Sequence, residues 1–76
     1  MDVFEKVKEI TAEVLRIDPE IIQIESDFRK DFEADSIDLF ELVMAMEDAF
    51  EMELEDEAVE SIQTVQDVVN YVQMKM

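Results

Sequence analysis

The residue that invites a chemical question is Ser36, a single hydroxyl between Asp35 and Asp38, directly ahead of the most apolar run of the chain. Ser and Asp are among the preferred caps of a helix N-terminus, so Asp35 or Ser36 is expected to accept a hydrogen bond from a first-turn amide. One cap is enough, which leaves the other side chain spare. A serine at such a junction is exposed, and the partial positive charge of a helix start stabilises an attached phosphate. The pattern supports two interpretations, a plain capping serine and a serine that another enzyme modifies.

The side chains that most often perform catalysis are missing. The chain contains no Cys and no His, so it has neither a thiolate nor an imidazole to act as nucleophile, general base or transition-metal ligand. Paired carboxylates would need a cleft and raised pKa values, and 76 residues with so many solvated acids offer little of either. No D-x-D-x-D-G calcium loop is present. We expect no catalytic residues, no metal site and a protein that is not an enzyme.

The charge of the chain limits the classes of molecule that it can bind. Twenty-two acidic residues against six basic ones give a net charge of −16. Such a surface repels nucleic acids and anionic lipids, and it favours proteins that present Lys/Arg patches. No apolar run approaches the ~20 residues that span a bilayer, and the N-terminus lacks the features of a signal peptide. We expect a cytoplasmic monomer with no membrane insertion and one domain over residues 1–76.

Two elements are expected ahead of Ser36. Apolar residues at helical spacing predict a helix from Val3 to near Arg16 or Ile17, opened by a capping box of Asp2 and Glu5 and stopped before Pro19. Residues 18–35 show no sustained period. The large apolar residues of this segment predict a loop that is packed onto the core: Ile21, Ile24, Phe28 and Phe32.

Three helices are expected from Ser36 onward. The first runs from Ser36 to about Met52. A short helix over EAVESI follows, and Thr64 with Asp67 predicts the N-cap of a last helix that reaches Met76. The fold class is therefore all-α, a small bundle of three main helices plus one short helix with a long packed loop between the first and second helices. Apolar residues cover a broad face of the helix after Ser36: Ile37, Phe40, Val43, Met44, Ala45, Met46, Ala49 and Phe50.

The motif ADSID, followed by ELVMAMEDAFEMELEDEAVESIQTVQDVVNYV, resembles the acyl carrier proteins of bacterial type II fatty acid synthesis. The resemblance covers nearly the whole chain, from about Val3 to Val72. It implies that Ser36 is the attachment site of 4′-phosphopantetheine, with Asp35 and Asp38 as the other residues of the cofactor-binding site. A Mg²⁺-dependent phosphopantetheinyl transferase would take the group from coenzyme A. The thiol that the chain lacks would then arrive on the cofactor. The protein would present acyl groups to fatty acid synthesis enzymes and catalyse none of their reactions.

Further site residues follow from the same resemblance. The second helix would meet basic patches on partner enzymes, with Ile37 as an apolar contact. For any one acid taken singly, a merely solvated helix face is a sufficient explanation. The acids that would face the partners are Asp35, Asp38, Glu41, Glu47 and Asp48. An acyl chain would fold back between the helices, among residues that otherwise form plain core: Phe28, Met46, Leu54, Val59, Ile62, Val68 and Tyr71.

Two departures and two alternatives accompany this resemblance. The family usually has Gly where this chain has Glu33, and often where it has Arg16; if Glu33 needs a positive φ, the cost is roughly 1 kcal/mol. Ile37 replaces the commoner Leu. The alternatives are a carrier for a specialised polyketide or aminoacyl route and, in a different class, an acidic helical adaptor that is never modified.

Overall fold

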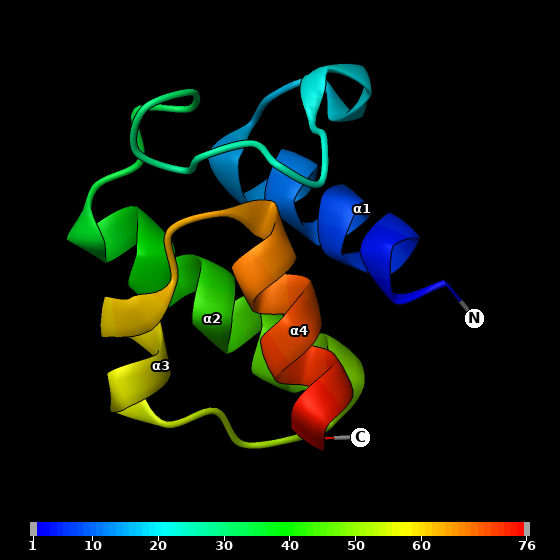
Figure 1. Cartoon of the computed structure of the whole chain (residues 1–76), viewed down its shortest axis with the longest axis vertical. Coiled ribbons are helices and arrows are strands. Elements are labelled where there is room, and N and C mark those ends of the chain that lie inside the picture. The colour runs from blue at the N-terminus through cyan, green and yellow to red at the C-terminus, as the bar shows by residue number, and fades with distance from the viewer. Residues whose placement is uncertain (1, 76) are drawn as a thin grey trace.

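The computed structural model describes residues 2–75 and has the expected helical order (Figure 1). Three longer helices and two short ones follow one another: α1 (Val3–Leu15), η1 (Pro19–Ile21, a 3₁₀ turn), α2 (Ser36–Phe50), α3 (Asp56–Ser61) and α4 (Val65–Lys75). Within residues 2–75 the only strand-like pairing is one antiparallel bridge between Asp27 and Thr64. The predicted bundle of three main helices plus a short one is confirmed. Met76, the predicted end of the last helix, lies outside the described residues.

Helix α1 begins and ends close to the predicted positions. The Asp2 carboxylate caps it by accepting the Phe4 amide at 3.0 Å. Glu5, the other member of the predicted capping box, pairs with Lys8 at 3.3 Å, one turn further on. At the other end Arg16 adopts the left-handed conformation (φ 58°), so the main chain leaves the helix there, ahead of Pro19.

The segment between α1 and α2 is packed onto the core, as predicted, but one of the four predicted residues faces outward. Phe28 is fully buried, whereas Ile21 is 55% exposed and its neighbour Ile22 is 4% exposed. Asp18 and Pro19 start the 3₁₀ turn η1, and this turn leaves Ile21 on its outer side. Phe32 packs edge-on against Phe28 with ring centroids 6.2 Å apart.

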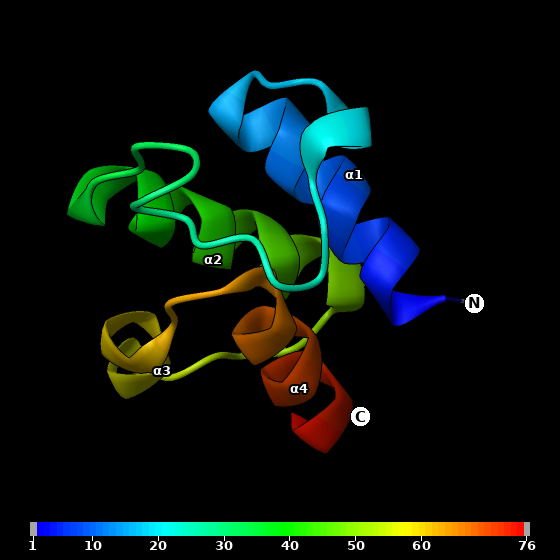
Figure 2. The same cartoon turned by 45° about the horizontal axis from the view of Figure 1, so that its top comes forward.

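Main-chain hydrogen bonds fasten this loop to the junction between α3 and α4. The amide of Phe28 donates to Gln63 at 3.0 Å, that of Val65 to Ser26 at 3.0 Å, and that of Gln66 to Ile24 at 2.8 Å. Both ribbon views show the loop passing over the first turn of α4 (Figures 1 and 2). The segment that leads to Ser36 is therefore held by the last third of the chain.

Helix α2 buries a narrower face than the sequence suggests. Leu39, Leu42, Val43 and Met46 form its buried face. By contrast, Ile37 is 70%, Phe40 48% and Met44 65% exposed, so the packed face takes up only part of the broad apolar face that the sequence shows. The helix ends at Phe50 rather than near Met52, because Glu51 turns into the left-handed conformation (φ 53°).

The short and last helices follow the sequence closely. Thr64 Oγ accepts the Asp67 amide at 3.2 Å, while the Asp67 carboxylate accepts the Thr64 amide at 3.0 Å. This reciprocal pair is the predicted N-cap of α4. One apolar core joins the inner faces of α1, α2 and α4 with Phe28 and with residues from α3 and its flanks.

Candidate functional site

The start of α2 is closed by two carboxylates, and neither cap uses the serine between them. Asp35 Oδ1 accepts the Asp38 amide at 2.9 Å, and Asp38 Oδ2 accepts the Asp35 amide at 3.1 Å. Asp35 is the N-cap residue and Ser36 is the first residue of the helix. Of the two capping candidates the structure selects Asp35, which leaves the Ser36 hydroxyl spare.

The Ser36 side chain is exposed at the junction between the loop and the helix. Its Oγ has one neighbour at hydrogen-bonding distance in the described part of the chain, Nη2 of Arg29, which donates across 3.5 Å. A bond of this length to a neutral oxygen is weak. The hydroxyl is thus open to an approaching enzyme, and a cationic group lies beside it.

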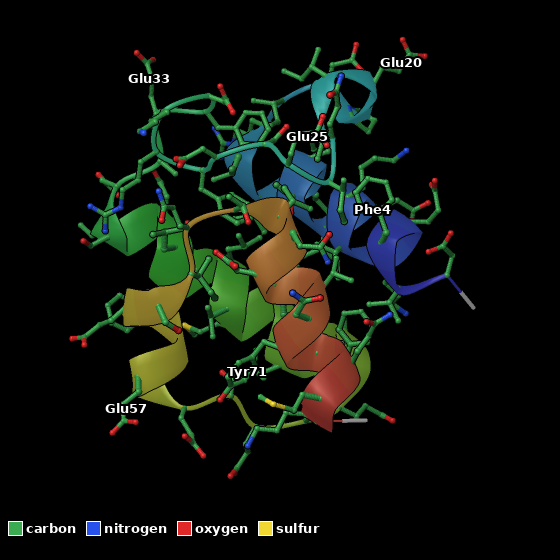
Figure 3. All side chains as sticks on the ribbon, in the orientation of Figure 1. Phe4, Glu20, Glu25, Glu33, Glu57 and Tyr71 are labelled. Atoms are coloured by element: carbon green, nitrogen blue, oxygen red, sulfur yellow. The ribbon has the colours of Figure 1, made fainter. Side chains whose placement is uncertain are left out.

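The loop ahead of Ser36 is shaped by one residue in an unfavourable conformation. Glu33 has φ 53°, in the left-handed region that favours glycine. Figure 3 shows its side chain at the outer edge of the loop, pointing away from the helices. The next residue, Ala34, is buried, and its amide donates to Phe28 at 2.9 Å. The condition of a positive φ at Glu33 is met. Arg16, the other position where the family often has Gly, also has a positive φ, and so does Glu51, which the sequence analysis did not single out.

The five acids predicted to meet partners differ in what they already contact. Asp35 and Asp38 are engaged in the capping box. Glu47 is half-buried, and its Oε2 accepts the Leu54 amide at 3.0 Å, which ties the chain after α2 back onto that helix. Glu41 and Asp48 are exposed. Three of the five therefore hold main-chain amides, and two present their charge to solvent.

Sequence reasoning named Ile37 as a partner contact but missed the two residues that extend it along the helix. Ile37, Phe40 and Met44 are the exposed large apolar residues of α2. Their spacing of three and four residues places them on one stripe. The available signal was the excess of apolar residues in this helix, which is more than one buried face can hold.

The seven residues predicted to line an acyl pocket do come together. Six of them are buried in the single apolar core, and Tyr71 packs against it partly exposed. Ile62 and Tyr71 also line an open cleft beside α4, together with Ser61, Asp67, Asn70 and Met74. Met46 is unbranched and is the most adaptable of these side chains.

The electrostatics of the site are dominated by acids with few cations among them. The sequence has no Lys or Arg between Lys30 and Lys75. The main-chain N–H of Lys30 is the largest of several influences that lower the pKa of Asp27, followed among the favourable ones by the Gln63 side chain and the main-chain N–H of Arg29. Among the described residues no group of three or more acids is arranged to hold a metal ion, and no helix is long and apolar enough to cross a membrane.

Comparison with known proteins places this geometry in context. A family model described as the phosphopantetheine attachment site matches residues 5–72. The chain is 51% identical over 70 residues to an acyl carrier protein of Clostridium acetobutylicum, covering 92% of this chain and 91% of the relative. It is 47% identical over 75 residues to one of Bdellovibrio bacteriovorus, covering 99% and 96%. Its fold is similar to that of a solved structure from Mycobacterium tuberculosis assigned to the acyl carrier proteins (Rv0033), with a TM-score of 0.91 and 27% identity, covering 99% of this chain and 100% of that one.

Proposed function

The chain belongs to the phosphopantetheine-attachment family of acyl carrier proteins, and we propose that its 4′-phosphopantetheine is attached to Ser36. It is a carrier of acyl chains and not an enzyme. The bound cofactor supplies a terminal thiol, which holds the acyl group as a thioester. The family also implies interaction with enzymes of fatty acid synthesis.

The observation that carries the proposal is the capping box of Asp35 and Asp38. Because the two carboxylates satisfy the amides of Asp35 and Asp38, the Ser36 hydroxyl has no structural duty. It is exposed at the first position of a helix, where an attached phosphate is electrostatically favoured. The site therefore fits a phosphodiester.

The attachment step uses only one atom of this chain. Ser36 Oγ forms a bond to the phosphorus of coenzyme A that bears pantetheine, the pyrophosphate P–O bond breaks, and adenosine 3′,5′-bisphosphate leaves. The chain has no His, and the carboxylates beside Ser36, Asp35 and Asp38, each hold a main-chain amide, so we assign the hydroxyl proton to a base of the transferase. The transferase also supplies the Mg²⁺ that neutralises the pyrophosphate.

The surface around α2 supports docking to basic partners. Glu41 and Asp48 present exposed charge, and Ile37, Phe40 and Met44 give an apolar stripe on the same helix. Exposed ion pairs are worth less than ~1 kcal/mol each, which suits partners that must dissociate quickly. The Asp35, Asp38 and Glu47 carboxylates would contribute long-range attraction while keeping their main-chain contacts. We place the working protein in the cytoplasm as a monomer.

The acyl chain is proposed to fold back into the core beside α4. The predicted residues already form one apolar cluster, and the open cleft at Ile62 and Tyr71 gives that cluster an edge at the surface. A guest would have to displace close-packed side chains, since Phe28 and Met46 are almost completely buried. The flexible Met46 is the residue best suited to yield.

The attachment site can be tested by intact mass. The protein is incubated with coenzyme A, Mg²⁺ and a broad-specificity transferase, beside Ser36→Ala and the matched control Ser61→Ala, which changes another exposed serine. We expect one phosphopantetheine arm on the parent and on Ser61→Ala, and none on Ser36→Ala. A Ser36→Ala protein that still gains the arm would refute the assignment. No gain on any protein with two different transferases would favour the unmodified adaptor.

A further inference from the structure

Arg29 is the one cationic side chain that contacts the proposed attachment residue in the described part of the chain. Its Nη2 lies 3.5 Å from Ser36 Oγ. Lys30 is adjacent in sequence and also exposed, yet it makes no such contact among the described residues. These are the last cations before a long acidic stretch that runs to Lys75.

The main chain around Arg29 is fixed from both sides. The preceding residue, Phe28, is fully buried and donates its amide to Gln63 at 3.0 Å. Asp27 Oδ1 accepts the amides of Arg29 at 2.9 Å and Lys30 at 2.8 Å. The Arg29 side chain therefore starts from an anchored turn, and its reach to Ser36 does not depend on a free loop.

The charge of Arg29 is not used by any carboxylate nearby. Within residues 2–75 the ion pairs are Lys8 with Glu5 and Lys75 with Glu55. Arg29 has acids close by in sequence at Asp27, Asp31 and Asp35, yet its side chain contacts a neutral hydroxyl. A guanidinium that faces a hydroxyl gains little, whereas one that faces a phosphate oxygen gains a charge-assisted hydrogen bond, two of them when the geometry is bidentate.

We propose that Arg29 clasps the phosphodiester once it is formed on Ser36. This inference rests on the proposed attachment at Ser36. The phosphorus would be bonded directly to Ser36 Oγ, the oxygen that Arg29 already contacts. The charged oxygens of the phosphate would then be within reach of the Arg29 guanidinium. The added negative charge falls between Asp35 and Asp38, and Arg29 offsets that repulsion. Arg29 acts as a positioning residue that holds the root of the arm against the loop.

A comparison of unloaded and loaded proteins tests the clasp. Melting temperatures are measured for both forms of the parent, Arg29→Gln and the matched control Lys30→Gln, with loading on Ser36 confirmed by mass. A merely structural role of Arg29 would change both forms equally. We expect the change in melting temperature on loading to be about 2–4 °C less favourable in Arg29→Gln than in the parent, with Lys30→Gln like the parent. High salt should shrink this difference.

A second readout needs no change at Arg29. The chain has two arginines, Arg16 and Arg29, so the Nε–H resonances in a nitrogen–proton NMR spectrum can be assigned with Arg16→Lys. Loading should shift the Arg29 resonance and leave that of Arg16 in place. This measurement decides the matter even if Arg29→Gln cannot be loaded.

The outcomes separate the inference from the function on which it rests. If the parent gains no arm on Ser36, the proposed function fails and the clasp fails with it. If the parent loads on Ser36 but the Arg29 resonance stays in place, or Arg29→Gln and Lys30→Gln respond to loading alike, the clasp alone is overturned.

Discussion

Asp35 accepts the main-chain amide of Asp38 at 2.9 Å and Asp38 accepts that of Asp35 at 3.1 Å, and together they close the first turn of α2. The serine enclosed between them takes no part in this exchange. The cap and the proposed attachment residue therefore share one helix start, and the cap does not involve the Ser36 hydroxyl.

We predict that Asp35→Ala lowers the free energy of unfolding by about 1 kcal/mol, because an amide of the first turn loses its acceptor. Ser36→Ala should stay within about 0.5 kcal/mol of the parent, since its hydroxyl holds nothing in place. Urea unfolding of the unmodified proteins measures both. A loss in Ser36→Ala as large as that in Asp35→Ala would show that the serine also caps.

Thr11 offers a route to higher stability. It lies on α1, fully buried, and its hydroxyl is a buried polar group without a partner in the described part of the chain. Thr11→Val keeps the shape and removes the unsatisfied group, so we expect a gain of about 1 kcal/mol in thermal unfolding.

Thr64→Val is the control for that substitution. It removes the hydroxyl that accepts the Asp67 amide at the start of α4, and it should cost about 1 kcal/mol. If Thr11→Val raises and Thr64→Val lowers the free energy of unfolding, the difference is due to whether the hydroxyl has a hydrogen-bond partner. Destabilisation of both variants would mean that Thr11 has a partner that we have not recognised.

Residues with positive φ should prefer glycine. Glu33→Gly is expected to raise the free energy of unfolding by about 0.5–1 kcal/mol, because the relief of the left-handed strain exceeds the added entropy of the unfolded chain. Glu41→Gly, on the exposed face of α2, should lower it by about 1 kcal/mol. Calorimetry of the pair provides the measurement, and a destabilised Glu33→Gly would contradict the strain argument.

Asp27 should make a pH-dependent contribution to stability. The main-chain N–H of Lys30 leads the hydrogen bonds that lower its pKa, so the folded state favours the carboxylate. This contribution is complete above the ordinary Asp pKa of about 3.9 and is lost as the pH falls through the lowered pKa. Asp27→Asn should therefore be less stable than the parent at neutral pH, and the difference should disappear in acid. A difference that is constant with pH would assign the effect to packing.

Cations in solution should stabilise the fold. The net charge is −16, and residues 2–75 contain two ion pairs to relieve it. Added NaCl, and more effectively millimolar Mg²⁺, should raise the melting temperature by screening carboxylate repulsion. A melting temperature that stays flat or falls would count against this account. Sucrose at matched osmolality controls for general solvent effects.

The elements that could be predicted are those that local sequence decides. The cap at Thr64 and Asp67 joins groups three residues apart, and Pro19 stops a helix by its own covalent structure. Ser36 could be singled out for the same reason, since helix-cap chemistry and the family motif both lie within a few residues of it.

The remainder depends on contacts between distant segments. No local rule decides that Ile22 rather than Ile21 faces the core, or that Ile37, Phe40 and Met44 stay uncovered, because the packing of α1 and α4 decides both. The contact of Arg29 with Ser36 was missed because it depends on how the loop folds back, which in turn depends on Gln63.

The bonds that join Phe28 to Gln63 and Ser26 to Val65 make a closed ring of the chain between them. Closing a ring of this length costs on the order of 3 kcal/mol of chain entropy. Most of this entropy is lost when the first of the two bonds forms. Helices α2 and α3, with Ser36, lie inside that ring, while both termini lie outside it. Fraying that starts at either end of the molecule must therefore break these bonds before it reaches Ser36. We expect the amides of Phe28 and Val65 to exchange with solvent only in the globally unfolded state. Their exchange rates would then report the free energy of global unfolding of the carrier.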